Sequence, residues 1–143
     1  MKKQFIFILF VGLLFSLVAC GGTAETAVSD APAAEIDVTA LGNDIDVQTV
    51  AAVKDRDDVI VIDVREQWEY DEGHIPGVTL IPMAEVPNRL SEIPTDKEVI
   101  VTCRSGNRSN QVATFLREQG YTNIHNMQGG ILDWQAAGLP VDK

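Results

Sequence analysis

The sequence predicts an α/β fold, in which a small, doubly wound parallel sheet of about five strands carries helices on both faces. Two nearly continuous runs of β-branched residues, at 59–64 and 99–102, are typical of strands that are buried on both faces of a parallel sheet. Stretches with the apolar spacing of helices alternate with these runs, as in parallel sheets covered by helices. The length of 143 residues fits one such domain with appendages.

The first nineteen residues are typical of a secretory signal peptide. Lys2 and Lys3 form a basic start, and no charge follows from Phe5 to Ala19. This apolar stretch is short for a membrane-spanning helix, which needs roughly 20 apolar residues. A buried core helix is the alternative, but it would carry polar residues along one face.

Residues 17–21, Leu-Val-Ala-Cys-Gly, resemble the lipobox of bacterial lipoproteins. In that family the peptide is cut before the cysteine, which then receives acyl chains. The resemblance implies lipidation of Cys20 and an exported protein that is anchored to a bacterial membrane, since several acyl chains give stable attachment. An ordinary secreted protein with a cysteine at this position is the alternative.

The stretch that would follow the anchor, residues 20–35, consists mainly of small and acidic residues without an aromatic side chain. We predict a flexible acidic tether here and place the folded domain at 36–143. The formal net charge is −10 for the whole chain and would be −12 without residues 1–19, which hold two lysines and no acid. This excess of acid argues against nucleic acid or anionic lipid as a partner. The oligomeric state is unknown from the sequence.

The expected elements of the domain follow from apolar spacing and from residues that start or stop helices. Asp46 can cap a first helix, Pro87 implies a break or late start in another, and Gly120 can end a third. In chain order we predict a helix at 47–53, strands at 59–64 and 78–81, a helix at 84–93, a strand at 99–102, a helix at 109–119, a strand around Ile124 and a helix at 131–137.

Cys103 directly follows a predicted strand, at the sheet edge where such folds bind ligands. Gly106 and Asn107 tolerate positive φ, so the turn can point several backbone N–H groups into one anion-binding concavity. The next helix N-terminus, Arg104 and Arg108 add positive charge. Such surroundings lower the pKa of a thiol, and the thiolate is the nucleophilic form.

We therefore predict that Cys103 is a catalytic nucleophile at the edge of this concavity. If Cys20 is acylated, Cys103 has no second cysteine for a disulfide, which is unusual outside the cytoplasm. A structural cysteine in a surface loop is the plain alternative. The predicted binding site for an anionic or sulfur-rich electrophile comprises Arg104, Ser105, Gly106, Asn107, Arg108 and Ser109.

Three blocks in this order resemble the single-domain rhodaneses, a sulfurtransferase family, over roughly residues 36–140. The blocks are residues 62–66 (IDVRE) with 73–77 (GHIPG), residues 103–109 (CRSGNRS), and residues 128–131 (QGGI) with Trp134. The resemblance implies that the Cys103 thiolate takes the outer sulfur of a donor such as thiosulfate and becomes a persulfide. The sulfur then passes to a thiol or to cyanide. Arg104 and Arg108 would hold the donor anion, and no cofactor is expected.

Two other functions remain open at this stage. Related phosphatases and arsenate reductases have five residues between cysteine and arginine, whereas four separate Cys103 from Arg108, and Ser109 stands where their arginine would be. The shorter loop suits a sulfur atom better than a tetrahedral oxyanion. A non-catalytic persulfide carrier or binding module would use the same loop without turnover.

Asp63 and Arg65 lie at the carboxyl end of the predicted strand at 59–64, and we expect them to support the site as a structural ion pair and helix cap. The alternative is that Arg65 contributes charge to the site or that Asp63 orients groups of the loop. His74 lies in a Gly- and Pro-rich turn and is expected to be structural, and His125 is expected to be incidental. With two histidines and one free cysteine, no metal-ligand cluster is expected.

Three aromatic residues and a group of acidic residues are expected to have structural or solvent-facing places. Trp68, Tyr70 and Trp134 are expected to pack in the domain, with a place at the pocket entrance as the alternative. The acidic residues of this segment are expected to form a solvated face, and they are Glu66, Glu69, Asp71 and Glu72.

Overall fold

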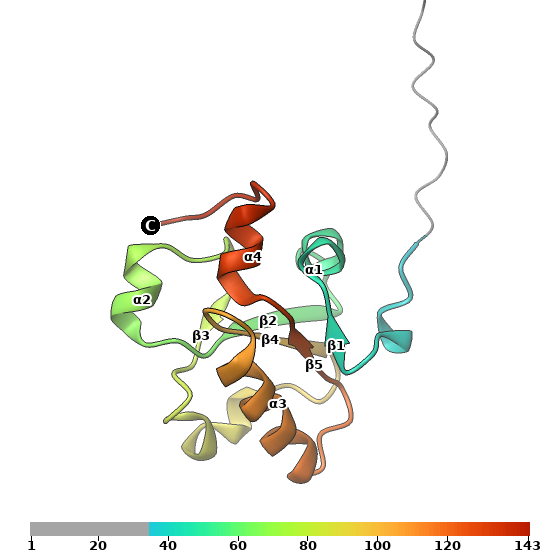
Figure 1. The fold of residues 1–143 in the computed structure, drawn as a ribbon. Coiled ribbons are helices and arrows are strands. Elements are labelled where there is room, and N and C mark those ends of the chain that lie inside the picture. The colour runs from blue at the N-terminus through green and yellow to red at the C-terminus, as the bar shows by residue number, and fades with distance from the viewer. Residues whose placement is uncertain (1–34) are drawn as a thin grey trace, which may run out of the picture. The chain divides into compact units, whose positions relative to one another are not determined.

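The computed structural model describes residues 35–143, drawn in colour in Figure 1. The predicted signal peptide, Cys20 and nearly all of the predicted tether lie outside the described residues. Within residues 35–143, no helix combines the length and the apolar character needed to cross a membrane.

The described residues form a five-stranded sheet in the order β1-β5-β4-β2-β3, and every neighbouring pair of strands is parallel. The α/β fold class predicted from the sequence is therefore confirmed. The strands are β1 (Asp44–Ile45), β2 (Val59–Asp63), β3 (Thr79–Leu80), β4 (Glu98–Thr102) and β5 (Ile124–Met127).

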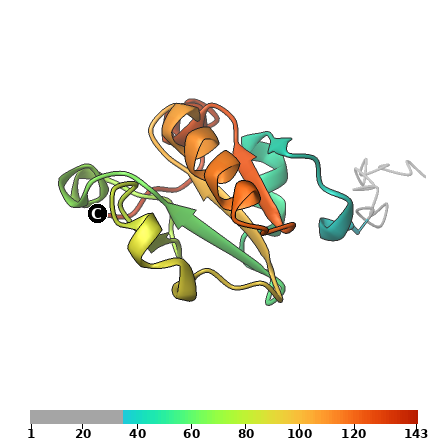
Figure 2. The same cartoon turned by 90° about the horizontal axis from the view of Figure 1, so that it is seen from below.

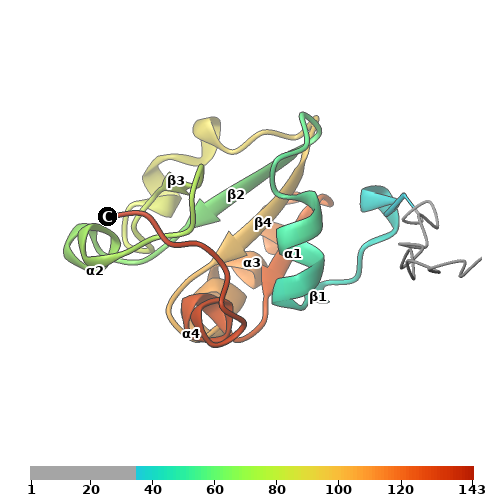
Figure 3. The ribbon, with the colours of Figure 1, turned by 90° about the horizontal axis from the view of Figure 1, so that it is seen from above.

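Helices cover both faces of this sheet (Figures 1 and 2). The α-helices are α1 (Val47–Val53), α2 (Gln67–Glu72), α3 (Asn107–Glu118) and α4 (Gly130–Ala136). α1 and α4 contact each other on one face, whereas α3 lies on the other face (Figure 3). α2 lies beside β3, at the carboxyl end of β2.

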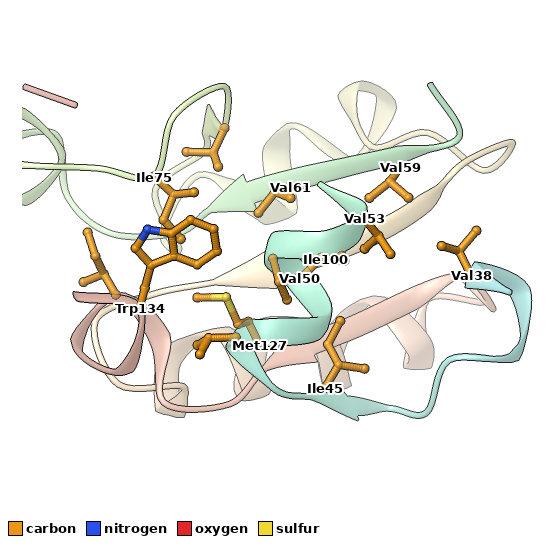
Figure 4. Packing of buried hydrophobic residues seen from close by; sticks show 13 residues of the cluster. Val38, Ile45, Val50, Val53, Val59, Val61, Ile75, Ile100, Met127 and Trp134 are labelled. Carbon is orange, nitrogen blue, oxygen red and sulfur yellow. The ribbon is translucent and has the colours of Figure 1, made fainter. Parts of the chain in front are cut away.

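Two apolar cores, one on each face, explain why the central strands β2 and β4 are apolar at successive positions. On the face of α1 and α4, Val50 and Val53 of α1 pack with Val61, Ile100 and other buried residues (Figure 4). On the α3 face, alternate residues of β4 and then Cys103 join the second core, which they share with Val112 and Leu116 of α3. Because side chains alternate along a strand, burial of both sets requires a strand without a polar face.

The structure corrects two of the predicted elements and adds three that were not predicted. The segment 84–93 holds two short 3₁₀ helices, η2 (Val86–Asn88) and η3 (Leu90–Glu92), instead of one α-helix. Pro87 has no N–H to donate into an α-helical ladder, which accounts for the break. α3 begins at Asn107, two residues before the predicted start, and the sequence analysis did not predict β1, α2 or the 3₁₀ helix η1 (Val38–Ala40).

The strand order creates a switch point between β2 and β4. After β2 the chain continues to β3 on one side, and after β4 it continues to β5 on the other side. The connections leaving these neighbouring carboxyl ends therefore run in opposite directions, and open α/β sheets bind ligands at such points. Cys103 is the first residue after β4, and Asp63 is the last residue of β2.

Candidate active site

The cysteine loop, residues 103–109, turns directly from β4 into α3. Gly106 lies in the left-handed region with a φ of 89° and is the N-cap of α3, so only four residues separate the strand from the helix. The Gly106 N–H donates to Cys103 Sγ over 3.2 Å. Cys103 is only 1% exposed, so the sulfur lies beneath the turn and not at its edge, where the sequence analysis had placed it.

The N-terminus of α4 holds the shape of this turn. Ile131 N–H donates to the Cys103 carbonyl over 2.9 Å, and Leu132 N–H donates to the Arg104 carbonyl over 3.1 Å. In a trans peptide the C=O and N–H groups point in opposite directions, so fixing these carbonyls on α4 turns the next N–H groups away from α4. The helix thereby orients the loop amides around the sulfur.

Gly130 makes this close approach possible. Its φ is 59°, and a Cβ at this position would lie 2.6 Å from the Arg104 carbonyl carbon. A side chain would therefore force the loop and α4 apart, in addition to straining the backbone. Gly130 of the QGGI segment is thus explained by the need for backbone to pack on backbone.

Ser109 links the sulfur to a buried polar chain that ends at the surface. Its hydroxyl lies 3.4 Å from Cys103 Sγ, 3.1 Å from the Gly106 carbonyl and 2.7 Å from Asn126 Oδ1. The Asn126 amide nitrogen donates to Asp44 Oδ1 over 2.7 Å. Because a carboxylate only accepts, Asp44 fixes the Asn126 amide with its oxygen towards Ser109. The Ser109 hydroxyl has one proton and can therefore donate to only one of three acceptors at a time. One of these acceptors is the sulfur.

These contacts decide the ionisation of Cys103. Burial raises the pKa of the thiol, but hydrogen bonds from the Ser109 hydroxyl and from the N–H groups of Ser109, Ser105 and Gly106 outweigh it and lower the pKa below its ordinary value. The sequence predicted a lowered pKa for Cys103. Hydrogen-bond donors, more than the charges of the two arginines, are its main cause. The anionic form of the sulfur is the one that this loop stabilises.

The two arginines of the loop have different surroundings. Arg108 donates from both terminal nitrogens to the carboxylate of Glu69, over 2.6 and 2.7 Å. Glu69 is therefore buried and paired, and its predicted place on a solvated acidic face is wrong. This pairing with Arg108 lowers the pKa of Glu69. Arg104 is exposed and, within residues 35–143, forms no ion pair.

Asp63 and Arg65 form the predicted ion pair, which is buried at the end of β2. Arg65 donates to Asp63 over 2.7 Å, and its remaining N–H groups reach the carbonyls of Glu69 and Gly73 over 3.1 and 2.9 Å. Both carbonyls belong to α2 or its C-terminal end. The pair therefore fixes α2 against the carboxyl edge of the sheet, and with it the partner of Arg108.

The two histidines have structural contacts. His74 Nδ1 lies 3.0 Å from the Tyr70 carbonyl and its ring stacks on Tyr70, which confirms the predicted structural place. His125 is not incidental, because its two ring nitrogens contact the Gly42 carbonyl and Glu98 over 2.7 and 2.8 Å. In the described part of the chain, no group of three or more His, Cys, Asp or Glu residues is arranged to hold a metal ion.

A cleft of about 320 Å³ lies beside the cysteine loop. Arg104 lines it together with Glu69 and Trp68 from the α2 side and Leu132 from α4. Trp134 is fully buried, as predicted, but Trp68 is 62% exposed, so packing was the wrong prediction for Trp68 and the entrance was the right one.

Sequence reasoning missed Asp44, Asn126 and the role of Glu69. Asn126 lies in the last strand, near the carboxyl edge that also carries Cys103. A buried polar residue at that edge could have been a signal, had the strand been bounded correctly. Glu69 follows Glu66 at the spacing of a capping box, and its carboxylate accepts from the Glu66 N–H over 3.1 Å.

Comparison with known proteins agrees with this architecture. The family model of the rhodanese-like domain matches residues 46–137. The chain belongs to the rhodanese-like domain family. The sulfurtransferase of Allochromatium vinosum is 41% identical over 100 residues, which cover 69% of this chain and 94% of that protein.

Two further similarities place this rhodanese-like domain among known proteins. The thiosulfate sulfurtransferase GlpE of Pseudoalteromonas translucida is 35% identical over 83 residues, or 58% of this chain and 79% of that protein. The crystal structure of a rhodanese-related protein from Thermoplasma volcanium superposes with a TM-score of 0.64 at 32% identity, covering 71% of this chain and 98% of that one. These relatives support a rhodanese-type sulfurtransferase as the general class.

Proposed function

We propose that this rhodanese-like domain is a sulfurtransferase that moves a sulfane sulfur from an anionic donor such as thiosulfate through a persulfide on Cys103. The observation that carries the proposal is the buried sulfur of Cys103, which accepts hydrogen bonds from the loop and from Ser109 and whose pKa is lowered by them. A thiolate in this position is a ready nucleophile at the switch point of the sheet.

In the first step, the Cys103 thiolate attacks the outer sulfur of thiosulfate. A bond forms between Sγ and that sulfur, the sulfur–sulfur bond of thiosulfate breaks, and its electron pair leaves with sulfite. In the second step, a thiolate or cyanide attacks the outer sulfur of the persulfide, and the electron pair returns to Sγ. Each step exchanges one anion for another, so no general base or redox cofactor is required.

In this proposal the loop amides and the exposed Arg104 stabilise different negative charges. The N–H groups of the cysteine loop hold the charge of the thiolate and then of the persulfide. Arg104 holds the oxyanion end of the donor, because Arg108 already shares its charge with Glu69. The predicted role of Arg108 in donor binding therefore becomes secondary, and its main contribution is to join α2 to the loop.

The tight turn argues against phosphoryl or arsenate chemistry. The loop closes on Sγ within four residues, and its Gly106 N–H is directed at the sulfur itself. A cradle for a tetrahedral oxyanion needs donors arranged around the oxygens beyond the sulfur. A small sulfur-containing anion as donor and a thiol as acceptor suit this loop better.

Thiocyanate formation from thiosulfate and cyanide tests the reaction. We expect turnover by the wild-type protein and none by the Cys103→Ser variant, because a serine hydroxyl does not form a persulfide. Turnover by Cys103→Ser would contradict the proposal. Uptake of one sulfur without any discharge to cyanide or to a thiol would instead identify a persulfide carrier.

We also propose that the protein is exported and anchored to a bacterial membrane by lipidated Cys20. The proposal rests on the basic start, the apolar stretch and the lipobox-like residues 17–21. Expression of the full chain in bacteria, followed by membrane fractionation, tests it. The wild-type protein should be recovered with membranes and the Cys20→Ala variant should not; an unchanged distribution would contradict lipidation.

A further inference from the structure

Three exposed apolar side chains, Trp68, Leu132 and Val141, lie at the cleft beside the cysteine loop and are called the apolar rim here. The exposed large hydrophobic side chains of residues 35–143 are Trp68, Leu132 and Val141, with exposed fractions of 62%, 40% and 36%. Trp68 and Leu132 line the cleft with Arg104, and Val141 lies against Gly73, another cleft residue. The exposed large hydrophobic side chains of the described domain are therefore gathered at this cleft, next to the cysteine loop.

Each part of the rim is fixed by hydrogen bonds of its backbone or of its helix. Arg65 bonds to the carbonyls of Glu69 and Gly73 and so fixes the helix that carries Trp68. Leu132 N–H is bonded to the Arg104 carbonyl, so its position depends directly on the cysteine loop. The C-terminal segment with Val141 is held beside α2 by the paired backbones of His74 and Asp142, as the course of the chain in Figure 3 also shows.

Among the exposed charged residues of the segments that carry the rim and of the cysteine loop, acids outnumber bases. The exposed acids are Glu66, Asp71 and Glu72 on the α2 side, Asp133 on α4 and Asp142 near the C-terminus, against the bases Arg104 and Lys143. A fixed apolar surface with charged surroundings is typical of a protein interaction site. The charges favour a partner with basic residues around its own apolar contact.

We propose that the apolar rim docks a polypeptide that accepts the sulfur, one whose acceptor cysteine has apolar neighbours and flanking Lys or Arg residues. This proposal rests on the sulfurtransferase function proposed above. The partner's thiolate attacks the outer sulfur of the Cys103 persulfide, a new sulfur–sulfur bond forms on the partner, and the Sγ–S electron pair returns to Cys103. Basic neighbours also lower the pKa of the acceptor thiol, which raises its thiolate fraction.

Two other occupants of the rim fit the observations less well. A second copy of the chain would set the same five acids against one another, which opposes association. A surface of anionic lipid would be repelled by them as well. Cyanide or a small thiol is too small to gain binding energy from Trp68, which is 62% exposed. Aromatic side chains are frequent anchors of protein–protein contacts.

Discharge of the isolated persulfide to two matched peptides tests the proposal. The domain is loaded with thiosulfate, and loss of the extra sulfur is followed by mass for the peptides Lys-Leu-Cys-Leu-Lys and Glu-Leu-Cys-Leu-Glu and for cyanide. We expect the lysine peptide to react at least tenfold faster than the glutamate peptide at low salt. Trp68→Ala and Leu132→Ser should lower the lysine-peptide rate about fivefold or more.

Cyanide discharge separates docking from chemistry, because the ratio of the lysine-peptide rate to the cyanide rate should fall about threefold or more in both variants. Gln67→Ala is the matched control, because Gln67 is the exposed neighbour of Trp68 on the same helix and does not line the cleft. Equal rates for the two peptides, or equal slowing of peptide and cyanide by Trp68→Ala, would overturn the docking proposal.

Self-association is examined by sedimentation of the wild-type and Trp68→Ala proteins. A dimer that Trp68→Ala dissociates would assign the rim to a second copy and overturn the proposal. A monomer in both cases supports it. A wild-type protein that takes up no sulfur at all would instead contradict the sulfurtransferase function, so the two failures are distinguishable.

Discussion

The cysteine loop and the apolar rim lie side by side at the carboxyl edge of the sheet, yet they are built in opposite ways. In the loop, backbone N–H groups and the buried Ser109 surround a sulfur that is 1% exposed. On the rim, a hydrogen-bonded backbone presents large apolar side chains to solvent. The chemistry of the domain therefore depends mainly on backbone geometry, and its recognition depends on side chains.

This difference predicts how each region responds to substitution. A backbone-built loop should be sensitive to any added Cβ or lost donor, in both stability and sulfur uptake. Substitutions in the exposed rim should change the stability of the fold little. Their effect on sulfur transfer should appear only when a polypeptide partner is present.

The largest effect is expected for Gly130→Ala, which places a Cβ against the cysteine loop. The clash with the Arg104 carbonyl and the positive φ should lower the free energy of unfolding by about 3 kcal/mol and abolish sulfur uptake. Denaturant unfolding and mass analysis after thiosulfate treatment measure both effects.

Gly77→Ala is the matched control for Gly130→Ala. Its φ is 79°, but no heavy atom beyond its two chain neighbours lies within 4 Å of the added Cβ, so only backbone strain of about 1–2 kcal/mol remains. Sulfur uptake by Gly77→Ala should be retained. Equal losses in the two variants would show that the contact between α4 and the loop is unimportant.

The next effect is expected for Ser109→Ala. Loss of the hydroxyl, whose one proton is shared between Cys103 Sγ and Asn126 Oδ1, should raise the pKa of Cys103 and cost about 2 kcal/mol of stability. The pH profile of Cys103 alkylation should move to higher pH. Ser105→Ala is the control, because Ser105 is exposed and its backbone N–H remains; a shift as large in Ser105→Ala would contradict the assignment.

The same pKa sets the sign of a stability change with pH. The folded-state pKa of Cys103 lies below the ordinary thiol value of 9.0, so ionisation stabilises the fold fully above that value. The stabilisation is lost as pH falls through the folded-state pKa. In Ser109→Ala this pH-dependent difference should shrink, which unfolding measured on both sides of the window can show.

A smaller effect separates the two arginines. Arg108→Gln breaks a half-buried pair with Glu69 and should cost about 1 kcal/mol of stability. Arg104→Gln should leave stability unchanged and raise the KM for thiosulfate roughly tenfold, as expected for one lost charge near an anion. A KM change confined to Arg108→Gln would reverse the proposed roles.

The smallest effect on the fold is expected for Trp68→Ala. Because the side chain is mostly exposed, the free energy of unfolding should change by about 0.5 kcal/mol or less. A loss above about 2 kcal/mol would mean that Trp68 packs in the domain, and the contrast between loop and rim would fail there.

Much of the fold could be predicted from the sequence because the central strands are apolar on both faces. A parallel sheet with helices on both sides buries both of these faces. The N-cap at Asp46 was predictable for a similar reason, since its carboxylate accepts from the Thr49 N–H over 2.8 Å within one turn of chain. β1 was not predictable, because a two-residue edge strand has no periodicity.

The candidate site was predictable where its contacts are local and not where they cross the sheet. The turn after Cys103 could be inferred from Gly106 and from the strand that precedes it. Arg108 and Glu69 are 39 residues apart, and Asn126 and Asp44 are 82 apart, so their pairing depends on the tertiary structure. A solvated acidic face was the wrong interpretation of Glu69 for this reason.

The central claim is that the cysteine loop stabilises a persulfide on Cys103. Intact mass measurement of the purified domain, before and after treatment with thiosulfate, tests it most directly. We predict a gain of one sulfur atom that is removed by cyanide and is absent from the Cys103→Ser variant. An unchanged mass, or the same gain in Cys103→Ser, would contradict the account.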